Sequence, residues 1–144
     1  MQPPLFPAFP TPIRVLIVDD DPIFAGSLSA ILSGNPRIVV VDRAENGVEG
    51  VALAFRHRPD VVVMDVNMPI LDGFTATGEI RKRLPDAGIV VVSAAPEHEH
   101  LAAARRAGAD VYLRKDCGFE VLAEAVTAAA PARQDSTSSA SIVC

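Results

Sequence analysis

Residues 61–69 decide the fold of this chain, and their sequence is Val61-Val62-Val63-Met64-Asp65-Val66-Asn67-Met68-Pro69. The apolar run before Asp65 predicts a short strand that is buried on both faces. Asn67, Pro69 and the later Asp72-Gly73 pair predict the loop that ends this strand. A carboxylate at such a point lies at the C-terminal edge of a parallel sheet, where open α/β folds bind their ligands. We therefore expect the chemistry of the protein to centre on Asp65.

Four other short apolar runs alternate with helix signals along the chain. Asp21 and Pro22, for example, are a typical N-cap and first helical residue. Five strands alternating with five helices predict an α/β fold, in which a doubly wound (βα)5 parallel sheet of five strands carries helices on both faces. The predicted strands cover 13–18, 38–41, 61–65, 89–92 and 109–113, and the predicted helices follow Asp21, Gly47 and Gly73 and cover about 97–107 and 119–126.

The folded part is expected to be one domain over residues 13–129, a length that buries a sizeable core without disulfides. Residues 1–12 contain five prolines, which remove hydrogen-bond donors and block helix, so a disordered leader is predicted. Residues 130–144 are rich in serine and threonine and have few large apolar side chains. This composition predicts a disordered tail or linker.

Composition excludes several classes of function. The net charge of −5 over 144 residues argues against direct binding of nucleic acid by this segment. No apolar run reaches the roughly 20 residues needed to cross a membrane, and the N-terminus lacks the basic region of a signal peptide. The two cysteines, Cys117 and Cys144, predict neither a metal site nor a disulfide framework, so we expect a cytoplasmic protein in which Cys117 is an ordinary thiol.

Basic and histidine side chains outside the strand ends have simple interpretations. The groups at 56–58, 81–83 and 105–106 fall in the last turns of predicted helices, where cations oppose the helix dipole favourably. An RNA-binding surface is therefore not expected. His98 and His100 lie two residues apart, on different faces of a predicted helix, and are expected to be solvated.

Polar residues of chemical interest stand at the C-terminal ends of four predicted strands: Asp19 and Asp20, Asp65, Ser93, and Lys115. These ends lie side by side in a parallel sheet, so the five side chains are expected to converge. Three neighbouring carboxylates repel one another and raise one another's pKa. A divalent cation relieves this repulsion, and oxygen ligands of this kind favour Mg²⁺ over zinc. The sequence therefore predicts a magnesium site.

A carboxylate beside Mg²⁺, an ammonium and a hydroxyl is equipped to accept a phosphoryl group. Asp65 would attack phosphorus and form an acyl phosphate, which is an established use of aspartate as a nucleophile. Mg²⁺, Lys115 and Ser93 would then stabilise the charge on the oxygens of the transferring group. We expect the bound group to bias an equilibrium between two conformations of the domain.

Four segments together resemble the receiver (CheY-like) domain of two-component response regulators. They are VLIVDDDP at 15–22, MDVNMPILDG at 64–73, VVSAA at 91–95 and YLRKD at 112–116, and the resemblance covers about residues 13–129. It implies the flavodoxin-like strand order 2-1-3-4-5. The YLRKD segment has Asp116 where many receivers have proline, and it is closest in character to regulators of the NarL/LuxR type.

The resemblance also implies a role for each residue at the strand ends. Asp65 is the expected phosphoacceptor, and Asp19, Asp20, Asp65 and the backbone carbonyl of Asn67 are the expected ligands of Mg²⁺, for which Mn²⁺ would substitute. Ser93 and Lys115 are the expected phosphoryl-binding switch residues. Tyr112 is expected to turn inward when Ser93 moves toward the phosphoryl group.

The expected partners and output follow from the same resemblance. A sensor histidine kinase would supply the phosphoryl group, with weak self-phosphorylation and self-dephosphorylation but no enzymatic role. The output would be control of transcription through a DNA-binding domain absent from this chain. A homodimer would form either through the helix at 97–107, the strand at 109–113 and the last helix, or through the first and last helices.

Two alternatives remain open at this point. One is a small Mg²⁺-dependent phosphatase with an aspartyl-phosphate intermediate. Such enzymes need an acidic residue two positions after the nucleophile, and Asn67 stands there instead. The other is a binding scaffold on the same fold that works without phosphorylation. Turnover of a phosphomonoester would favour the first, and the absence of any response to Mg²⁺ and beryllium fluoride would favour the second.

Overall fold

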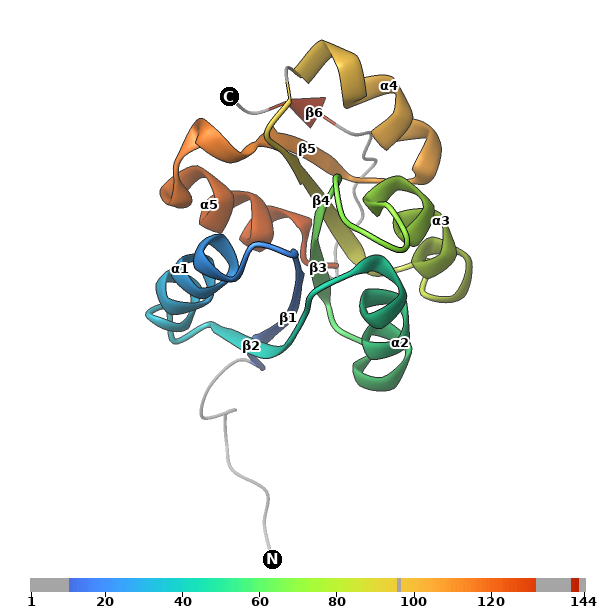
Figure 1. Ribbon diagram of the computed structural model, residues 1–144. Helices are drawn as coiled ribbons and strands as arrows, with labels where there is room; N and C mark the ends of the chain where they lie inside the picture. The colour runs from blue at the N-terminus through green and yellow to red at the C-terminus, as the bar shows by residue number, and fades with distance from the viewer. Residues whose placement is uncertain (1–10, 96, 132–140, 143–144) are drawn as a thin grey trace, which may run out of the picture.

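The computed structural model of the chain describes residues 11–95, 97–131 and 141–142. Strands and helices alternate from the N-terminus as predicted (Figure 1). The strands are β1 (Ile13–Val18), β2 (Ile38–Ala44), β3 (Val61–Asp65), β4 (Gly88–Ser93), β5 (Val111–Arg114) and β6 (Ser141–Ile142). The helices are α1 (Pro22–Ser33), α2 (Gly47–His57), α3 (Gly73–Arg83), α4 (Glu97–Ala107) and α5 (Phe119–Ala129), with a short 3-10 helix η1 (Lys115–Cys117).

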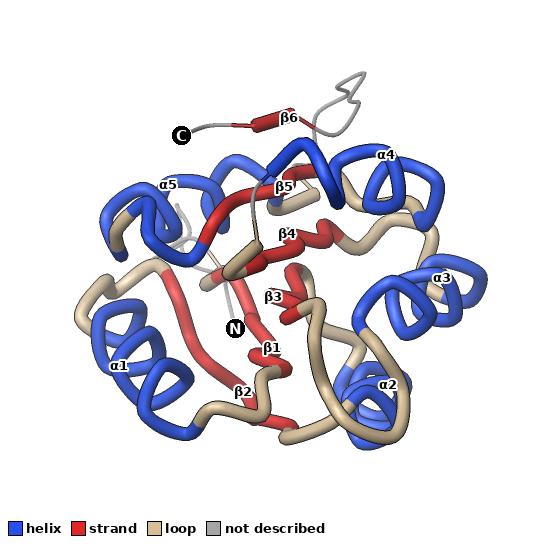
Figure 2. The backbone as a smooth tube through the Cα atoms, turned by 45° about the horizontal axis from the view of Figure 1, so that its top comes forward, coloured by secondary structure: helices blue, strands red, loops and turns tan. Residues whose placement is uncertain are grey.

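The strands form one parallel sheet in the order β2-β1-β3-β4-β5-β6. Helices α1 and α5 cover one face of this sheet, and α2, α3 and α4 cover the other (Figure 2). The predicted flavodoxin-like order 2-1-3-4-5 is therefore confirmed for the first five strands. Strand β3 lies at the centre, and all five of its residues are buried.

Two apolar cores lie on the two faces of the sheet because successive strand residues point to opposite sides. In β3, Val62 and Met64 pack into the core beneath α2, α3 and α4, whereas Val61 and Val63 pack into the core beneath α1 and α5. Burial on both faces explains why this strand is an uninterrupted apolar run rather than an alternating one. Asp65 is the last residue of this strand and is buried like the four residues before it.

Side-chain caps start the helices that follow β1, β2 and β3. Asp21 accepts hydrogen bonds from the amides of Ile23 and Phe24, and Asn46 accepts one from Glu49. Asp72 accepts from the amides of Phe74 and Thr75 at the start of α3. Such caps satisfy backbone donors that have no partner within the helix. Because the caps stand at the strand ends, they also hold the loops that carry the polar residues.

The C-terminal part of the chain differs from the sequence-based expectation in two places. Ser141 and Ile142 form β6, which pairs with Val111 and Tyr112 along the free edge of β5, so the described sheet has a sixth strand. Cys117 is disulfide-bonded rather than a free thiol, and its partner lies outside the described ranges. Both pairings join segments far apart in the sequence. An edge strand presents unpaired backbone groups to any extended segment that reaches it.

The predicted leader and most of the predicted tail, residues 1–10, 132–140 and 143–144, lie outside the described residues. Helix α5 ends at Ala129. None of the helices that the structure describes is long and apolar enough to cross a membrane.

Candidate functional site

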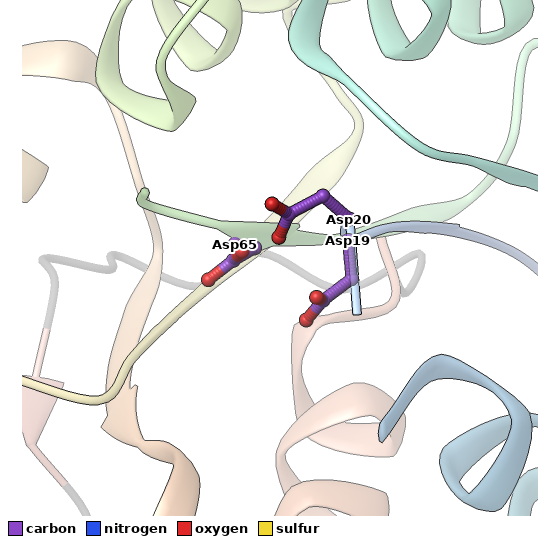
Figure 3. A group of neighbouring side chains, drawn as sticks. All are labelled: Asp19, Asp20 and Asp65. Atoms are coloured by element: carbon purple, nitrogen blue, oxygen red, sulfur yellow. The ribbon is translucent and has the colours of Figure 1, made fainter. Parts of the chain in front are cut away.

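Three carboxylates meet at the C-terminal edge of the sheet (Figure 3). Asp19 and Asp20 directly follow β1, and Asp65 is the last residue of β3, the strand beside it. One oxygen from each side chain lies within 4.8 Å of the others. Asp19 and Asp65 are 3% and 4% exposed, whereas Asp20 is open to solvent. The convergence expected from the strand ends is therefore present for the acidic residues.

Lys115 brings a positive charge to this cluster from the end of β5. Its Nζ lies 2.9 Å from Asp19 Oδ2 and 3.4 Å from Asp65 Oδ1. The ammonium also lies 4.5 Å from the centre of the Phe24 ring, and Phe24 packs against Phe119. The Phe24 ring thus contacts the Lys115 ammonium and helps to position it.

The electrostatics of the cluster follow from burial and charge balance. Loss of solvation and the charge of Asp19 raise the pKa of Asp65 to about 7, and Lys115 opposes this rise. Burial by itself would lower the pKa of Lys115, but its hydrogen bond with Asp19 and the charges of Asp65 and Asp19 raise it overall. Lys115 therefore stays charged, and one ammonium compensates only part of the charge of three carboxylates.

The donor set fits a hard divalent cation. Three carboxylates that already lie within 4.8 Å of one another offer oxygen ligands, which Mg²⁺ prefers, and no sulfur or imidazole takes part among them. Solvent-exposed Asp20 leaves the site open to water, which Mg²⁺ usually retains in its coordination shell. Asn67 is exposed in the loop two residues beyond Asp65, and the role of its carbonyl stays a prediction.

Ser93 and Tyr112 lie at the same edge of the sheet as the acidic cluster. Ser93 ends β4, one residue after Val92, which pairs with Asp65 in the sheet. Its side chain is completely buried. Tyr112 on β5 is also completely buried and packs in the core beneath α4. The inward movement predicted for Tyr112 stays a prediction.

The hydroxyl of Ser93 contacts a residue that the sequence analysis dismissed. Ser93 Oγ lies 3.0 Å from His100 Nδ1 and accepts a hydrogen bond of 3.0 Å from the amide of Ala95. The expectation that His100 is merely solvated is therefore wrong. His100 precedes the buried Ala104 by four residues, so both lie on the inner face of α4. The spacing of four residues could have indicated that His100 faces inward. The packing of α4 beside the end of β4, which brings His100 to Ser93, cannot be read from the sequence.

The loop after β3 is held tightly against the site. The amide of Gly73 donates to the carbonyl of Val66 at 2.9 Å, which folds the loop back on itself. A Cβ atom at Gly73 would lie 1.9 Å from the carbonyl oxygen of Asp65, so only glycine allows this approach. Ile70, at the tip of the loop, has φ of 74°, which is rare for a β-branched residue. Backbone strain of this kind is concentrated at functional sites.

Known proteins with similar sequences share this arrangement of segments. Residues 15–127 match the family model of the response regulator receiver domain. The nitrate/nitrite response regulator protein NarL of Escherichia coli strain K12 is 35% identical over 119 residues, which are 83% of this chain and 55% of that protein. Protein-glutamate methylesterase/protein-glutamine glutaminase 2 of Methanospirillum hungatei is 45% identical over 95 residues, 66% of this chain and 27% of that protein. The chain thus spans only part of the length of these relatives.

Solved structures agree with the sequence relatives. The receiver domain of the putative response regulator NarL from Mycobacterium tuberculosis superimposes with a TM-score of 0.78 at 31% identity, covering 83% of this chain and 96% of that one. The response regulator domain of Thermotoga maritima CheB gives a TM-score of 0.75 at 33% identity, covering 82% and 96%.

Proposed function

Because this chain belongs to the family of two-component response regulator receiver domains, we propose that it is a phosphorylation-controlled switch with Asp65 as its phosphoacceptor. The observation that carries the proposal is the placement of Asp65, which is 4% exposed yet shares a cluster with two other carboxylates and the Lys115 ammonium. For stability alone, an apolar residue would serve better at this position than a nearly buried carboxylate among other charges. The carboxylate is therefore explained by function.

The proposed transfer takes place between Asp65 and a phosphoryl donor. A carboxylate oxygen of Asp65 attacks phosphorus, and the bond from phosphorus to the donor, a histidine nitrogen of a sensor kinase, breaks. The electron pair of that bond leaves with the donor. Mg²⁺ held by Asp19, Asp20, Asp65 and the Asn67 carbonyl would supply positive charge next to the transferring oxygens. Lys115, already 3.4 Å from Asp65, is positioned to pair with a phosphoryl oxygen afterwards.

The protonation of Asp65 controls its reactivity. A pKa near 7 means that the nucleophile is protonated in part at neutral pH. Only the ionised carboxylate attacks, so any cation bound beside it favours the reactive form. We infer that metal binding and activation of Asp65 are the same event. Self-dephosphorylation would follow from attack of water on the acyl phosphate.

The response to phosphorylation is proposed to run through Ser93, Lys115 and Tyr112. A phosphoryl group adds negative charge and acceptor oxygens that attract the Ser93 hydroxyl and the Lys115 ammonium. Displacement of these two residues would change the packing around Tyr112, which is buried between β5 and α4. The surface formed by α4, β5 and α5 would then differ in conformation between the unphosphorylated and the phosphorylated domain.

The output, partner and location of the protein are proposed from its relatives and its family. Two relatives named as the nitrate/nitrite response regulator protein NarL and the transcriptional regulatory protein LiaR support an output in transcription, which we propose to run through a DNA-binding domain. Membership of the receiver family supports a histidine kinase as the partner, and the location proposed with it is the cytoplasm. The methylesterase relatives extend well beyond the matched residues, so their catalysis is not transferred to this chain. The phosphatase alternative is not favoured, since the amide of Asn67 cannot exchange a proton as a carboxyl group does.

Labelling with acetyl phosphate tests the proposal. We expect Mg²⁺-dependent incorporation of one acid-labile phosphoryl group into the wild-type chain and none into Asp65→Asn, because an amide is not a nucleophile of this kind. Asp86→Asn, an exposed position outside the acidic cluster, is the matched control and should be labelled like the wild type. Persistent labelling of Asp65→Asn, or labelling that is indifferent to EDTA, would refute the assignment.

A further inference from the structure

His100 connects the switch serine to the surface helix α4. Ser93 Oγ lies 3.0 Å from His100 Nδ1, and His100 is the fourth residue of α4. The imidazole ring also meets the Phe74 ring edge-on, with 5.3 Å between ring centres and 77° between planes. Phe74 belongs to the first turn of α3. The ring is therefore held from two sides and joins β4, α3 and α4 at the edge of the site.

Helix α4 buries little large apolar area among its residues whose side chains are described. Among its residues whose burial is described, Ala104 alone is fully buried, and Leu101 is only partly buried against the core. Small apolar area means a small hydrophobic contribution to holding the helix in place. The contact between buried Ser93 and His100 ties the N-terminal part of α4 to the end of β4.

The hydroxyl of Ser93 has only one proton to donate. Its oxygen already accepts a hydrogen bond from the amide of Ala95. If Ser93 donates its proton to Nδ1 of the neutral His100 ring, no donor remains for an oxygen of a phosphoryl group. Binding to His100 and binding to the phosphoryl group then exclude each other.

We propose that His100 is a positioning residue that holds the Ser93 hydroxyl in the unphosphorylated domain. Phosphorylation then acts on α4 because the phosphoryl group draws the Ser93 hydroxyl away from His100 Nδ1. The proposal rests on the function proposed for Asp65 and adds a physical route from that residue to the α4 surface. The route is an exchange of one hydrogen bond, which removes the polar contact between the end of β4 and the N-terminal part of α4.

A set of variants of His100 separates this role from general packing. His100→Phe keeps an aromatic ring against Phe74 but removes the nitrogen that faces Ser93. His100→Asn keeps a hydrogen-bond acceptor at a similar distance from the backbone. Each is combined with Ser93→Ala, in which the exchange cannot occur. The three single variants, the two double variants and the wild type are titrated with beryllium fluoride in the presence of Mg²⁺ and followed by NMR.

The exchange predicts tighter binding of beryllium fluoride by His100→Phe, by about threefold to tenfold, since one hydrogen bond no longer has to be broken. His100→Asn should bind like the wild type. In the Ser93→Ala background, His100→Phe should have no further effect, because the two residues act as one unit. Weaker binding by His100→Phe, an equal effect in both backgrounds, or failure of His100→Asn to restore the wild-type affinity would overturn the proposal.

The wild-type chain provides a measurement that needs no change at His100. The ¹⁵N shifts of the imidazole report whether Nδ1 accepts a hydrogen bond, and they should move in the same direction on Ser93→Ala substitution and on addition of beryllium fluoride. Imidazole shifts that ignore both changes would disprove the exchange while leaving phosphorylation of Asp65 intact. A wild-type chain that does not bind beryllium fluoride at all would disprove the proposed function together with the exchange.

Discussion

Asp65 has three ways to compensate its charge: a proton, the ammonium of Lys115, and a bound cation. Lys115 divides its contacts between Asp19 at 2.9 Å and Asp65 at 3.4 Å, so it satisfies the more buried pair of carboxylates only in part. Lost solvation, and to a smaller extent the charge of Asp19, raise the pKa of Asp65 to about 7. Protons would therefore compete with the proposed Mg²⁺ for the same carboxylate.

Stability without metal should fall as the pH rises, and Asp65 should be the cause. The pKa of its carboxyl group is 3.8 in the unfolded chain and about 7 in the folded one. The folded state therefore binds the proton more tightly, so this contribution is fully present below about pH 4 and is lost as the pH rises to about 7. In EDTA, we expect the wild type to lose about 2–3 kcal/mol more than Asp65→Asn between pH 5 and pH 8.

Urea unfolding of both chains at several pH values measures this difference. Added Mg²⁺ should restore stability to the wild type at pH 8 far more than at pH 5, because protons displace the cation at low pH. Parallel curves for the wild type and Asp65→Asn, with or without Mg²⁺, would show that the carboxyl group ionises freely in the folded chain.

At the scale of elements, the start of α3 is part of the site around Asp65. Asp72 caps the helix, and Gly73 lets the backbone pass close enough to Asp65 that a Cβ atom would come within 1.9 Å of its carbonyl oxygen. The helix cannot be displaced without displacing the strand end beneath it. The neighbouring Gly78 stands in the interior of the same helix, and a Cβ atom there would contact nothing within 4 Å.

Two glycine-to-alanine substitutions in α3 should therefore have opposite effects. Gly73→Ala should destabilise the domain by about 3 kcal/mol, because the overlap forces the backbone of the site apart. Gly78→Ala should stabilise it by about 0.5–1 kcal/mol, because alanine loses less backbone entropy in a helix. Urea unfolding checks both values, and acetyl phosphate labelling should fall only in Gly73→Ala. Similar effects of the two substitutions would mean that helix propensity, not contact with Asp65, governs position 73.

Helix α4 contrasts with α3 in how it is held. It contributes buried Ala104 and partly buried Leu101 to the core, and His100 near its start contacts Ser93. Local stability follows such differences in buried area, so elements that move are found where burial is small. The proposed movement of α4 rests on its alanine-rich composition, and the proposed control of that movement rests on its contact with the end of β4.

At the scale of the whole molecule, the two edges of the sheet differ. Strand β2 forms one edge, whereas the edge of β5 is covered in part by Ser141 and Ile142 of β6 (Figure 2). A two-residue pairing is short compared with an ordinary strand. It nevertheless lies on β5, between α4 and α5, where one of the two predicted dimer surfaces would form.

Removal of residues 132–144 should strengthen dimer formation by the activated domain. With beryllium fluoride, Mg²⁺ and a reducing agent present, we expect a several-fold lower dimer dissociation constant for the shortened chain, because β6 no longer competes for the α4, β5 and α5 surface. Analytical ultracentrifugation of both chains measures this constant. An unchanged constant would favour the surface of α1 and α5 instead, since neither helix pairs with β6.

Local patterns in the chain were enough to predict the central strand, the Asp21 cap of α1 and the fold. Strand β3 is apolar throughout because both of its faces are buried, and Asp21 and Asp72 cap helices through bonds to residues two or three positions away. These effects act within a few residues, so the sequence displays them directly. The strand-end positions of Asp19, Asp65 and Lys115 then followed from the geometry of a parallel sheet.

Contacts between segments distant in the sequence were decided by tertiary structure alone. His100 meets Ser93, β6 meets β5, and Arg81 is held by the carbonyls of Gly108, Pro85 and Ala87 and by Asp110, beyond its expected role at a helix end. The pKa of Asp65 belongs to the same class, because it depends on burial and on Asp19 across the sheet. Such properties depend on distances in space, and a hydrogen bond or a charge interaction is insensitive to how many residues separate its partners along the chain.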